Sequence, residues 1–199
     1  LLSSGAGSEV RTVIGLVIIC GILAATFFTL LVVPVAYDLL ARHVDRAYVS
    51  VRGDQAGDPL RAAYPQVVDG PTGRGPIAGI VAAQALHPDV AWLVVACDLP
   101  QLDDATLEEL LARRDAGRLA TAYASRHDGL PEPLCAIYEP ASREPVLAFI
   151  AGGRDCPRKF LASHDALLLP ARASAALDNA NTPADAAAVR QALAARGAR

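Results

Sequence analysis

Hydrophobic residues are distributed unevenly along this sequence, with one long apolar run followed by many short apolar segments. Residues 12–37 carry no charged side chain over 26 consecutive positions. The run is apolar on every side rather than along one stripe, which is typical of a helix in lipid or inside a helix bundle. About 20 apolar residues are enough for a helix to span the bilayer core. The pattern therefore predicts one transmembrane helix over residues 12–37.

A signal peptide and a buried core helix are the two other interpretations of this run. A signal peptide has a basic start, a shorter apolar region and a small-residue cleavage site, and the run fits that pattern poorly. Arg42 and Arg46 follow the run, whereas Arg11 precedes it, so the positive-inside bias places the C-terminal side in the cytoplasm. We expect a single-pass inner-membrane protein, with a transmembrane segment over residues 1–42 and a cytoplasmic domain over residues 43–199.

From residue 43 onward, short apolar runs alternate with segments that have the 3.6-residue period of helices. The segment Asp104–Arg114 has its leucines at helical spacing, and Ala91–Cys97 is a continuous apolar run, as in a strand covered on both faces. Alternating strands and helices indicate an α/β fold with an open, doubly wound, mostly parallel sheet. The expected strands are Ala47–Val51, Gln66–Val68, Ala91–Cys97, Leu119–Ala124, Leu134–Tyr138 and Ala166–Leu169, and the expected helices are Pro76–Leu86, Asp104–Arg114, Glu144–Ile150, Cys156–Ala162 and Pro183–Ala195.

Composition excludes two classes of protein. The chain has 199 residues, a formal net charge of −3 and 53% hydrophobic residues. A general nucleic-acid-binding protein would carry a basic surplus, and a disordered chain would have fewer apolar residues and more net charge. No methionine occurs in the sequence, so we expect it to be cut from a longer reading frame.

The cysteines are scattered and form no CxxC pair, and no histidine stands at metal-ligand spacing to a cysteine or to another histidine. We therefore expect neither a zinc site nor a disulfide framework. Buried or unreactive thiols are the expected state of all four, which are Cys20, Cys97, Cys135 and Cys156.

Acidic residues stand where open α/β sheets place their ligands, beyond the carboxyl ends of strands. Asp98 directly follows the predicted strand Ala91–Cys97, and Asp69 follows Gln66–Val68. A carboxylate at such a strand end can hold Mg²⁺, which bridges substrate phosphates. The glycine-rich residues 70–76 lead into a predicted helix and can present N–H groups to an anion. The alternatives are that Asp98 caps the next helix and that the glycine–proline segment is an ordinary turn.

Two asparagines, Asn179 and Asn181, stand shortly before the last predicted helix. Their amide groups can donate to a phosphate or lie around a metal ion. Equally, Asn181 or Thr182 can act only as the cap of that helix.

Four segments of the sequence occur in the order known from one enzyme family: GPIAGI at residues 75–80, WLVVACDLP at 92–100, PEPLCAIYEP at 131–140 and LDNANTPAD at 177–185. Together they resemble the molybdenum cofactor guanylyltransferase family over about residues 43–190. The resemblance implies a doubly wound nucleotide-binding fold that transfers GMP from Mg²⁺–GTP to molybdopterin. In this chemistry a terminal phosphate of the pterin cofactor attacks the α-phosphate of GTP.

The resemblance also implies roles for individual residues. Asp98 matches the family's aspartate that binds Mg²⁺ and nucleotide, and is the expected catalytic residue. Asp69 matches a nucleotide contact, and either Ser50 or Arg52 stands where the family has an asparagine near the base. The other expected binding residues are Gly75, Pro76 and Gly79 of the loop, with the pair Asn179 and Asn181.

The sequence departs from the family at its start. The family opens with a strand and a segment L-A-G-G-x-S-x-R-M-G-x-D-K that wraps the GTP phosphates, and nothing in this sequence matches it. Residues 3–42 instead resemble the last transmembrane helix of resistance-nodulation-division efflux pumps. We therefore hypothesise a gene fusion between a pump tail and a transferase domain that lacks its first part.

The missing segment has physical consequences, because the first strand of a doubly wound sheet lies centrally. Without it, Ala47–Val51 and Ala91–Cys97 must pair directly or leave backbone groups without partners, at a cost of roughly 1–3 kcal/mol for each buried group. We predict little or no guanylyltransferase activity. Two further functions are considered: an efflux-pump fragment with a passive soluble domain, and a module that binds a nucleotide or a partner without turnover.

Overall fold

The strands form two sheets rather than one. The structure, a computed structural model, describes residues 34–70, 75–180, 185, 189 and 191. In the smaller sheet, β1 (Val49–Val51) pairs in parallel with β2 (Gln66–Val68). The larger sheet has the order β3-β5-β4-β6, with bounds Trp92–Val95, Pro131–Tyr138, Ala120–Ala124 and Ala166–Leu169 respectively. Strand β5 runs antiparallel to both of its neighbours, whereas β4 and β6 are parallel.

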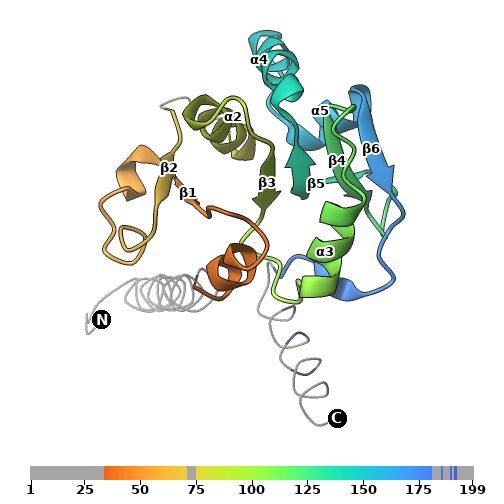
Figure 1. Ribbon diagram of the computed structural model, residues 1–199, viewed down its shortest axis with the longest axis horizontal. Helices are drawn as coiled ribbons and strands as arrows, with labels where there is room; N and C mark the ends of the chain where they lie inside the picture. Colours follow the sequence, from red (N-terminus) through yellow and green to blue (C-terminus); the bar gives the residue numbers. More distant parts are fainter. Residues whose placement is uncertain (1–33, 71–74, 181–184, 186–188, 190, 192–199) are drawn as a thin grey trace, which may run out of the picture.

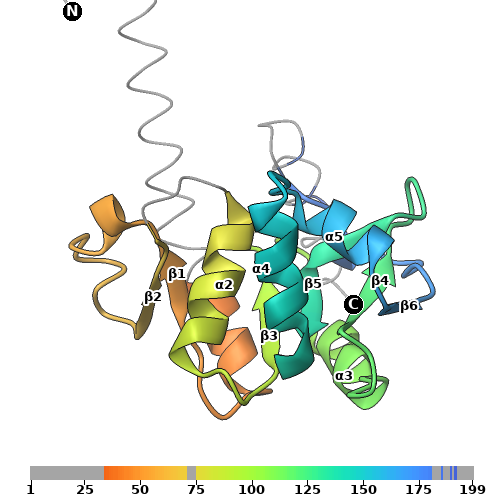
Figure 2. The same ribbon diagram turned by 90° about the horizontal axis from the view of Figure 1, so that it is seen from above.

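Helices cover both faces of the larger sheet (Figures 1 and 2). One face carries α2 (Pro76–Leu86), α4 (Arg143–Ala151) and α5 (Pro157–Ser163). The other face carries α3 (Asp104–Ala112) and the helical residues 34–41. Three short 3₁₀ helices connect these elements: η1 (Gly53–Gln55), η2 (Pro140–Ser142) and η3 (Ala175–Leu177).

Two hydrophobic clusters hold the helices against the sheet, one on each face. Successive residues of a strand point to opposite faces, so alternate residues of β4 and β5 enter different clusters. The first cluster joins these strands to α2, α4 and α5 through Ile77, Ile80, Ala120, Ala122, Ala136, Tyr138, Val146, Phe149, Phe160 and Leu161. The second joins them to α3 and the helical residues 34–41 through Leu39, Leu107, Leu110, Tyr123, Cys135, Ile137 and Leu169.

The α/β class predicted from the sequence is confirmed, and most predicted elements occur within a few residues of their expected bounds. Helix α2, strand β2 and strand β6 have the predicted bounds. Strand β5 begins three residues earlier than expected, at Pro131, and its antiparallel direction makes the larger sheet mixed. The predicted helix Pro183–Ala195 lies largely outside the described residues, of which 185, 189 and 191 are helical.

Strands β1 and β3 do not pair, so direct pairing across the missing strand does not occur within the described residues. Helix α2 instead contacts both strands and links the two sheets (Figure 2). Side chains also bridge them, because the ring of Tyr48, just before β1, lies 5.5 Å from the ring of Trp92 at the start of β3. The side chain of His87 stacks on Trp92, and its Nε2 lies 2.9 Å from the Tyr48 hydroxyl.

The helical residues 34–41 pack against the rest of the fold. Leu39 is buried in the second cluster, and the Tyr37 ring lies 4.6 Å from that of Tyr64. Just after the helix, the His43 ring nitrogen Nε2 lies 2.7 Å from an oxygen of Asp104 in α3. The predicted division between residues 42 and 43 stays a prediction, and the contacts of Tyr37 and Leu39 cross it.

The membrane prediction falls mainly on residues 12–33, which lie outside the described part of the chain. Among the residues that the structure describes, none belongs to a helix with the length and apolarity needed to cross a membrane.

Candidate functional site

Asp69 and Asp98 follow the two strands that flank helix α2 in the sequence, and α2 contacts both strands. A strand–helix–strand connection of this kind normally joins parallel strands, so we infer that β2 and β3 end at one edge of the fold. Asp69 follows β2 and Asp98 follows β3, so both carboxylates stand at this edge. Open α/β sheets bind ligands there.

Ser50, Asp69 and Gly79 form a tight polar contact at one side of this edge. The Ser50 hydroxyl donates to Asp69 Oδ1 at 2.8 Å, joining β1 to the residue after β2. Gly79, in the second turn of α2, faces this pair, and a Cβ there would lie 2.6 Å from Ser50 Oγ and 3.2 Å from Asp69 Oδ1. The glycine therefore allows the helix to approach the two polar side chains.

The start of α2 is shaped by the two residues that the sequence analysis placed in the binding loop. Gly75 has φ 64°, a left-handed conformation that favours glycine, and Pro76 occupies the first helical position. The N-cap of α2 has no side-chain hydrogen bond. The Ala78 N–H donates to the Gly75 carbonyl at 3.1 Å.

Arg52 does not join the contact between Ser50 and Asp69. Its guanidinium donates to both carboxylate oxygens of Asp54, at 3.1 and 3.2 Å, on the exposed surface of η1. The hydrogen bond and charge of Asp54 raise the pKa of Arg52 above its ordinary value. Of the two alternatives for the position near the base, the structure therefore places Ser50 beside Asp69.

Asp98 is half-buried at the end of β3, and a later segment of the same chain reaches this strand end. The Ala180 N–H donates to the Asp98 carbonyl at 3.0 Å, which brings residues 178–180 to this strand end. The side chain of Asn179 is exposed, and Asn181 lies outside the described residues. Desolvation and the neighbouring Asp98 carboxylate raise the pKa of the Cys97 thiol, so this thiol is protonated at neutral pH.

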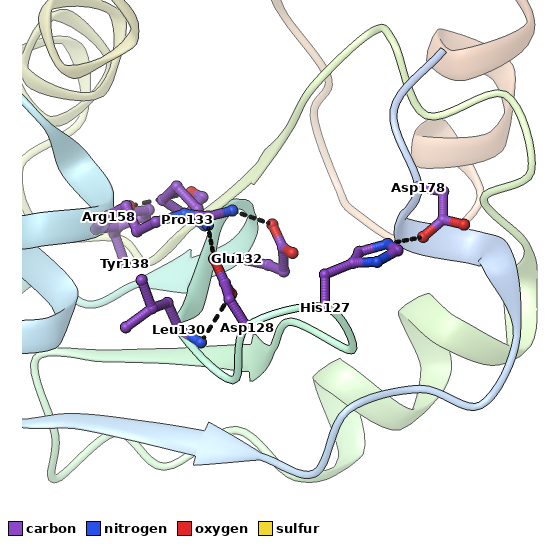
Figure 3. Close-up of polar contacts among 8 residues, drawn as sticks. All are labelled: His127, Asp128, Leu130, Glu132, Pro133, Tyr138, Arg158 and Asp178. Carbon is purple, nitrogen blue, oxygen red and sulfur yellow. Dashed lines mark hydrogen bonds and ion pairs between the residues drawn. The ribbon is translucent and has the colours of Figure 1, made fainter. Parts of the chain in front are cut away.

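A further polar cluster lies after the carboxyl end of β4, and sequence reasoning did not identify it. Asp178 accepts hydrogen bonds from the guanidinium of Arg126. It also accepts from His127, whose Nε2 lies 3.0 Å from Asp178 Oδ1 (Figure 3). Burial alone would raise the pKa of Asp178, but these hydrogen bonds outweigh it and hold the pKa below its ordinary value. The only signal in the sequence is the pair Arg126 and His127, which stands shortly after the predicted strand Leu119–Ala124.

Arg158 of α5 belongs to the same region. Its guanidinium donates to Asp128 at 3.0 Å and to Glu132 at 3.1 Å, which ties α5 to the turn before β5 (Figure 3). A small pocket lies next to this turn, lined by Ala124, Ser125, Arg126, His127, Glu132, Arg172, Ser174, Leu177 and Asp178. Each of the pocket's two arginines, Arg126 and Arg172, is paired with a carboxylate, so the lining carries no surplus of positive charge.

The donor groups at this edge fit a magnesium ion that is shared with a substrate. Within the described part of the chain, no group of three or more histidine, cysteine, aspartate or glutamate residues could hold a metal ion by itself. Mg²⁺ commonly takes one or two carboxylates and completes its shell with water and substrate phosphates. Asp98 can supply one such carboxylate.

Open α/β folds bind their ligands beyond the carboxyl ends of strands, where Asp69 and Asp98 stand in this chain. Residues 31–167 match the family described as MobA-like NTP transferase domain, and the chain belongs to this family. Residues 1–41 match the AcrB/AcrD/AcrF family.

Named relatives agree with this family. The chain is 34% identical over 150 residues to a molybdenum cofactor biosynthesis bifunctional protein of Synechocystis, a match that covers 75% of this chain and 43% of that protein. It is 32% identical over 117 residues to a probable molybdenum cofactor guanylyltransferase of Trichormus variabilis, covering 58% of this chain and 56% of the relative. The chain therefore spans about half the length of the curated relatives it matches.

Two solved structures share the fold. One is molybdopterin-guanine dinucleotide biosynthesis protein A from Archaeoglobus fulgidus, with a TM-score of 0.64, 22% identity and coverage of 79% of this chain and 84% of that one. The other is a putative protein from Aquifex aeolicus, with a TM-score of 0.69, 16% identity and coverage of 81% and 84%.

Proposed function

We propose that this chain binds Mg²⁺–GTP at the carboxyl edge of its strands and derives from a nucleotidyltransferase that acts in molybdenum cofactor biosynthesis. The observation that supports this most directly is the contact among Ser50, Asp69 and Gly79 at the same edge as Asp98. Family membership and the named relatives support the substrate class.

Asp69 and Ser50 would bind the base side of the nucleotide. Asp69 Oδ1 already accepts from Ser50, which leaves acceptor capacity on the second oxygen, Oδ2. A carboxylate is an acceptor, and the edge of guanine offers adjacent N–H donors. The absence of a side chain at Gly79 keeps the Ser50–Asp69 pair in this position.

Asp98 would act at the phosphate side of the nucleotide. When bound, Mg²⁺ would neutralise phosphate charge and orient the α-phosphate for attack. The Asp98 carboxylate would hold the ion, while its backbone carbonyl stays bonded to Ala180. In the family reaction, an oxygen of the acceptor's terminal phosphate forms a bond to the α-phosphorus and pyrophosphate leaves.

We further propose that this chain transfers GMP to molybdopterin weakly or not at all. Developing charge on the transferring phosphate is normally stabilised by preorganised donors and cations. The glycine-rich segment that supplies them in the family has no match in the sequence, and no lysine occurs before Lys159.

Membrane attachment is a separate proposal. The uncharged residues 12–37 and the match of residues 1–41 to the AcrB/AcrD/AcrF family support an anchor that holds the nucleotide-binding domain at the cytoplasmic face. Retention of the full chain in the membrane pellet after alkaline carbonate washing is the expected result. Release into the supernatant would contradict the anchor.

Calorimetric titration of the full chain with GTP and Mg²⁺ tests the nucleotide site. The wild type should bind, and Asp98→Asn should weaken the binding about tenfold or more, a loss of about 1.4 kcal/mol. The matched control is Asp89→Asn, because Asp89 is an exposed aspartate in the loop before β3, at the opposite end of that strand. Absence of GTP binding, or equal binding by Asp98→Asn, would refute the proposal.

A transfer assay with GTP labelled at the α-phosphate separates binding from catalysis. We expect binding by the wild type with little label in the pterin product. Rapid labelling would contradict weak transfer while supporting the nucleotidyltransferase site.

A further inference from the structure

The carboxyl ends of β3 and β4 lie at the same edge of the larger sheet. Strand β5 lies between these strands and is antiparallel to both, so β3 and β4 run in the same direction. The start of β5 stands beside both ends, because Pro131 pairs with Ala124 of β4 and the Leu134 carbonyl accepts from the Ala96 N–H after β3. Neighbouring strands lie about 5 Å apart, so about 10 Å separates β3 from β4.

Residues 178–180 bridge these two strand ends. At one end of the segment, the Asp178 carboxylate accepts hydrogen bonds from Arg126, which follows β4. At the other end, the Ala180 N–H donates to the Asp98 carbonyl at 3.0 Å. An extended chain advances about 3.5 Å per residue, so two residue steps and an arginine side chain together cover the distance. The segment therefore links the turn after β4 to the residue that follows β3.

Both carboxylate oxygens of Asp178 take part in this link. Arg126 Nε donates to Oδ1 at 2.8 Å and Arg126 Nη2 donates to Oδ2, while His127 Nε2 lies 3.0 Å from Oδ1 (Figure 3). A two-pronged contact between a guanidinium and a carboxylate fixes direction as well as distance. Burial raises the pKa of Asp178, but the hydrogen bonds from Arg126 and His127 lower it more, so the carboxylate is charged at neutral pH.

The segment is also anchored just before Asp178. Ala176 of η3 is completely buried, and Leu177 packs against the second cluster. Loss of the contact with Arg126 would therefore loosen residues 178–180 while η3 stays in place.

Asp98 stands beyond the last ladder bond of β3, so its orientation depends on contacts outside the sheet. Strand β3 ends at Val95, the Ala96 N–H still donates to β5, and Asp98 lies in the turn that follows. The Arg126 side chain is 40% exposed, and ion pairs at such exposure add little to the stability of a whole fold. The effect of the Arg126–Asp178 pair is therefore local.

We propose that Arg126 is a positioning residue for Asp98: by holding Asp178, it keeps the Ala180 N–H on the Asp98 carbonyl and so orients the Asp98 carboxylate toward Mg²⁺–GTP. The inference rests on the proposed function, because it requires that Asp98 takes part in nucleotide binding. Arg126 would act only through residues 178–180, without contacting the nucleotide itself.

Amide hydrogen exchange of the full chain in detergent, followed by NMR, tests the link without nucleotide. In the wild type, the Ala180 amide should exchange slowly because it is hydrogen-bonded. Arg126→Met keeps a long side chain but removes its donors, and it should speed this exchange about tenfold or more by local opening. Asp178→Ala should have the same effect from the other end of the contact. The Ala96 amide, bonded to β5, should be unchanged in both variants if the fold is intact.

A double-mutant cycle, measured by calorimetric titration with Mg²⁺–GTP, tests the consequence for the site. Arg126→Met should weaken binding about fivefold when Asp98 is present. In the Asp98→Asn background, the same change should weaken binding less than about 1.5-fold, because the carboxylate that Arg126 positions is already lost. Arg126→Lys keeps the charge and part of the hydrogen bonding, so it should bind within about twofold of the wild type.

Arg118→Met is the matched control. Arg118 also pairs with an aspartate, Asp165, and its side chain is similarly exposed, but it precedes β4 and lies at the opposite end of that strand. The control should change neither the exchange of the Ala180 amide nor the affinity for GTP.

Two results would refute the positioning role alone. Unchanged exchange of the Ala180 amide in Arg126→Met would mean that Arg126 does not hold the segment. An equal loss of GTP affinity with and without the Asp98 carboxylate would mean that Arg126 acts independently of Asp98. Failure of the wild type to bind GTP would refute the proposed function and with it the positioning role, whereas the exchange result would still show whether the link exists.

Discussion

Gly79 has no room for a methyl group unless a neighbour moves. A Cβ would meet Ser50 Oγ at 2.6 Å, and this hydroxyl is the donor to Asp69. A hydroxyl can rotate away, so the contact is cheap to relieve, but rotation would break the Ser50–Asp69 hydrogen bond. A larger residue in place of Gly79 should therefore disturb the Ser50–Asp69 contact while leaving the stability of the fold nearly unchanged.

Gly79→Ala should weaken GTP binding about tenfold and change the free energy of unfolding by less than about 1 kcal/mol, because alanine favours the helix by about that amount. Calorimetric titration and urea unfolding measure the two effects. Gly53→Ala is the control, since a Cβ at Gly53 meets nothing within 4 Å. If Gly79→Ala binds GTP as tightly as the wild type, Ser50 and Asp69 do not belong to the nucleotide site.

The ion pair between Arg114 and Glu139 contains a carboxylate that is almost completely buried. The Glu139 side chain is 2% exposed and accepts from Arg114 Nε and Nη2 at 2.6 and 2.7 Å. The hydrogen bonds to Glu139 and the charge of this carboxylate raise the pKa of Arg114 above its ordinary value, against the opposing effect of desolvation. Removing the cation would leave a buried carboxylate without its partner.

Arg114→Met should lower the free energy of unfolding by about 2–3 kcal/mol, somewhat less than for a fully buried pair because Arg114 itself is 40% exposed. Unfolding in urea can be followed by the fluorescence of the single tryptophan, Trp92. The neighbouring Arg113, paired with the more exposed Glu109, provides the control, and Arg113→Met should cost less than about 1 kcal/mol. If Arg114→Met and Arg113→Met lower the free energy of unfolding equally, burial of Glu139 does not determine the cost of losing its partner.

Sequence reasoning located Asp69 and Asp98, because a carboxylate after an apolar run is visible without the fold. It could not foresee the contact between Asp178 and His127, since 51 positions separate the two residues. The same limit applies to the choice between Ser50 and Arg52, which depends on the direction of each side chain and on the competing partner Asp54.

At the scale of elements, local signals predicted α2 well and β5 poorly. Gly75, which is left-handed in the structure, and Pro76 mark the start of α2. A glycine followed by a proline at this point is visible in the sequence. Strand β5 starts with two prolines in three residues, a pattern that favours a loop. Its pairing between β3 and β4 is set by long-range contacts, which the linear pattern does not contain.

The helical residues 34–41 are a second element whose role sequence reasoning did not anticipate. The sequence analysis assigned them to a membrane segment resembling an efflux pump, yet Leu39 lies 8% exposed among side chains of α3, β4 and β5. We infer that this helix end stabilises the α/β fold.

Leu39→Ala should therefore lower the free energy of unfolding by about 2–4 kcal/mol, from lost burial and the cavity left behind. Val35→Ala, at a position 68% exposed on the same helix, should cost less than about 0.5 kcal/mol. Urea unfolding in detergent compares the two variants. If Leu39→Ala is as stable as Val35→Ala, the helix end does not belong to the core.

At the scale of the whole molecule, the residues of the proposed nucleotide site come from both sheets. Ser50 and Asp69 come from the smaller sheet, whereas Asp98 follows the first strand of the larger one, and α2 holds the sheets together. The proposed nucleotide site thus depends on a link made by a helix and an aromatic contact rather than by strand pairing. We propose that both sheets contribute residues to nucleotide binding.

An NMR map of amide shifts of the full chain, with and without Mg²⁺–GTP, tests that claim most directly. We predict that the largest changes fall on both sheets at the carboxyl edge, at Ser50, Asp69, Gly79 and Asp98. Changes confined to one sheet, or centred on residues 87–91 at the opposite end of β3, would contradict it.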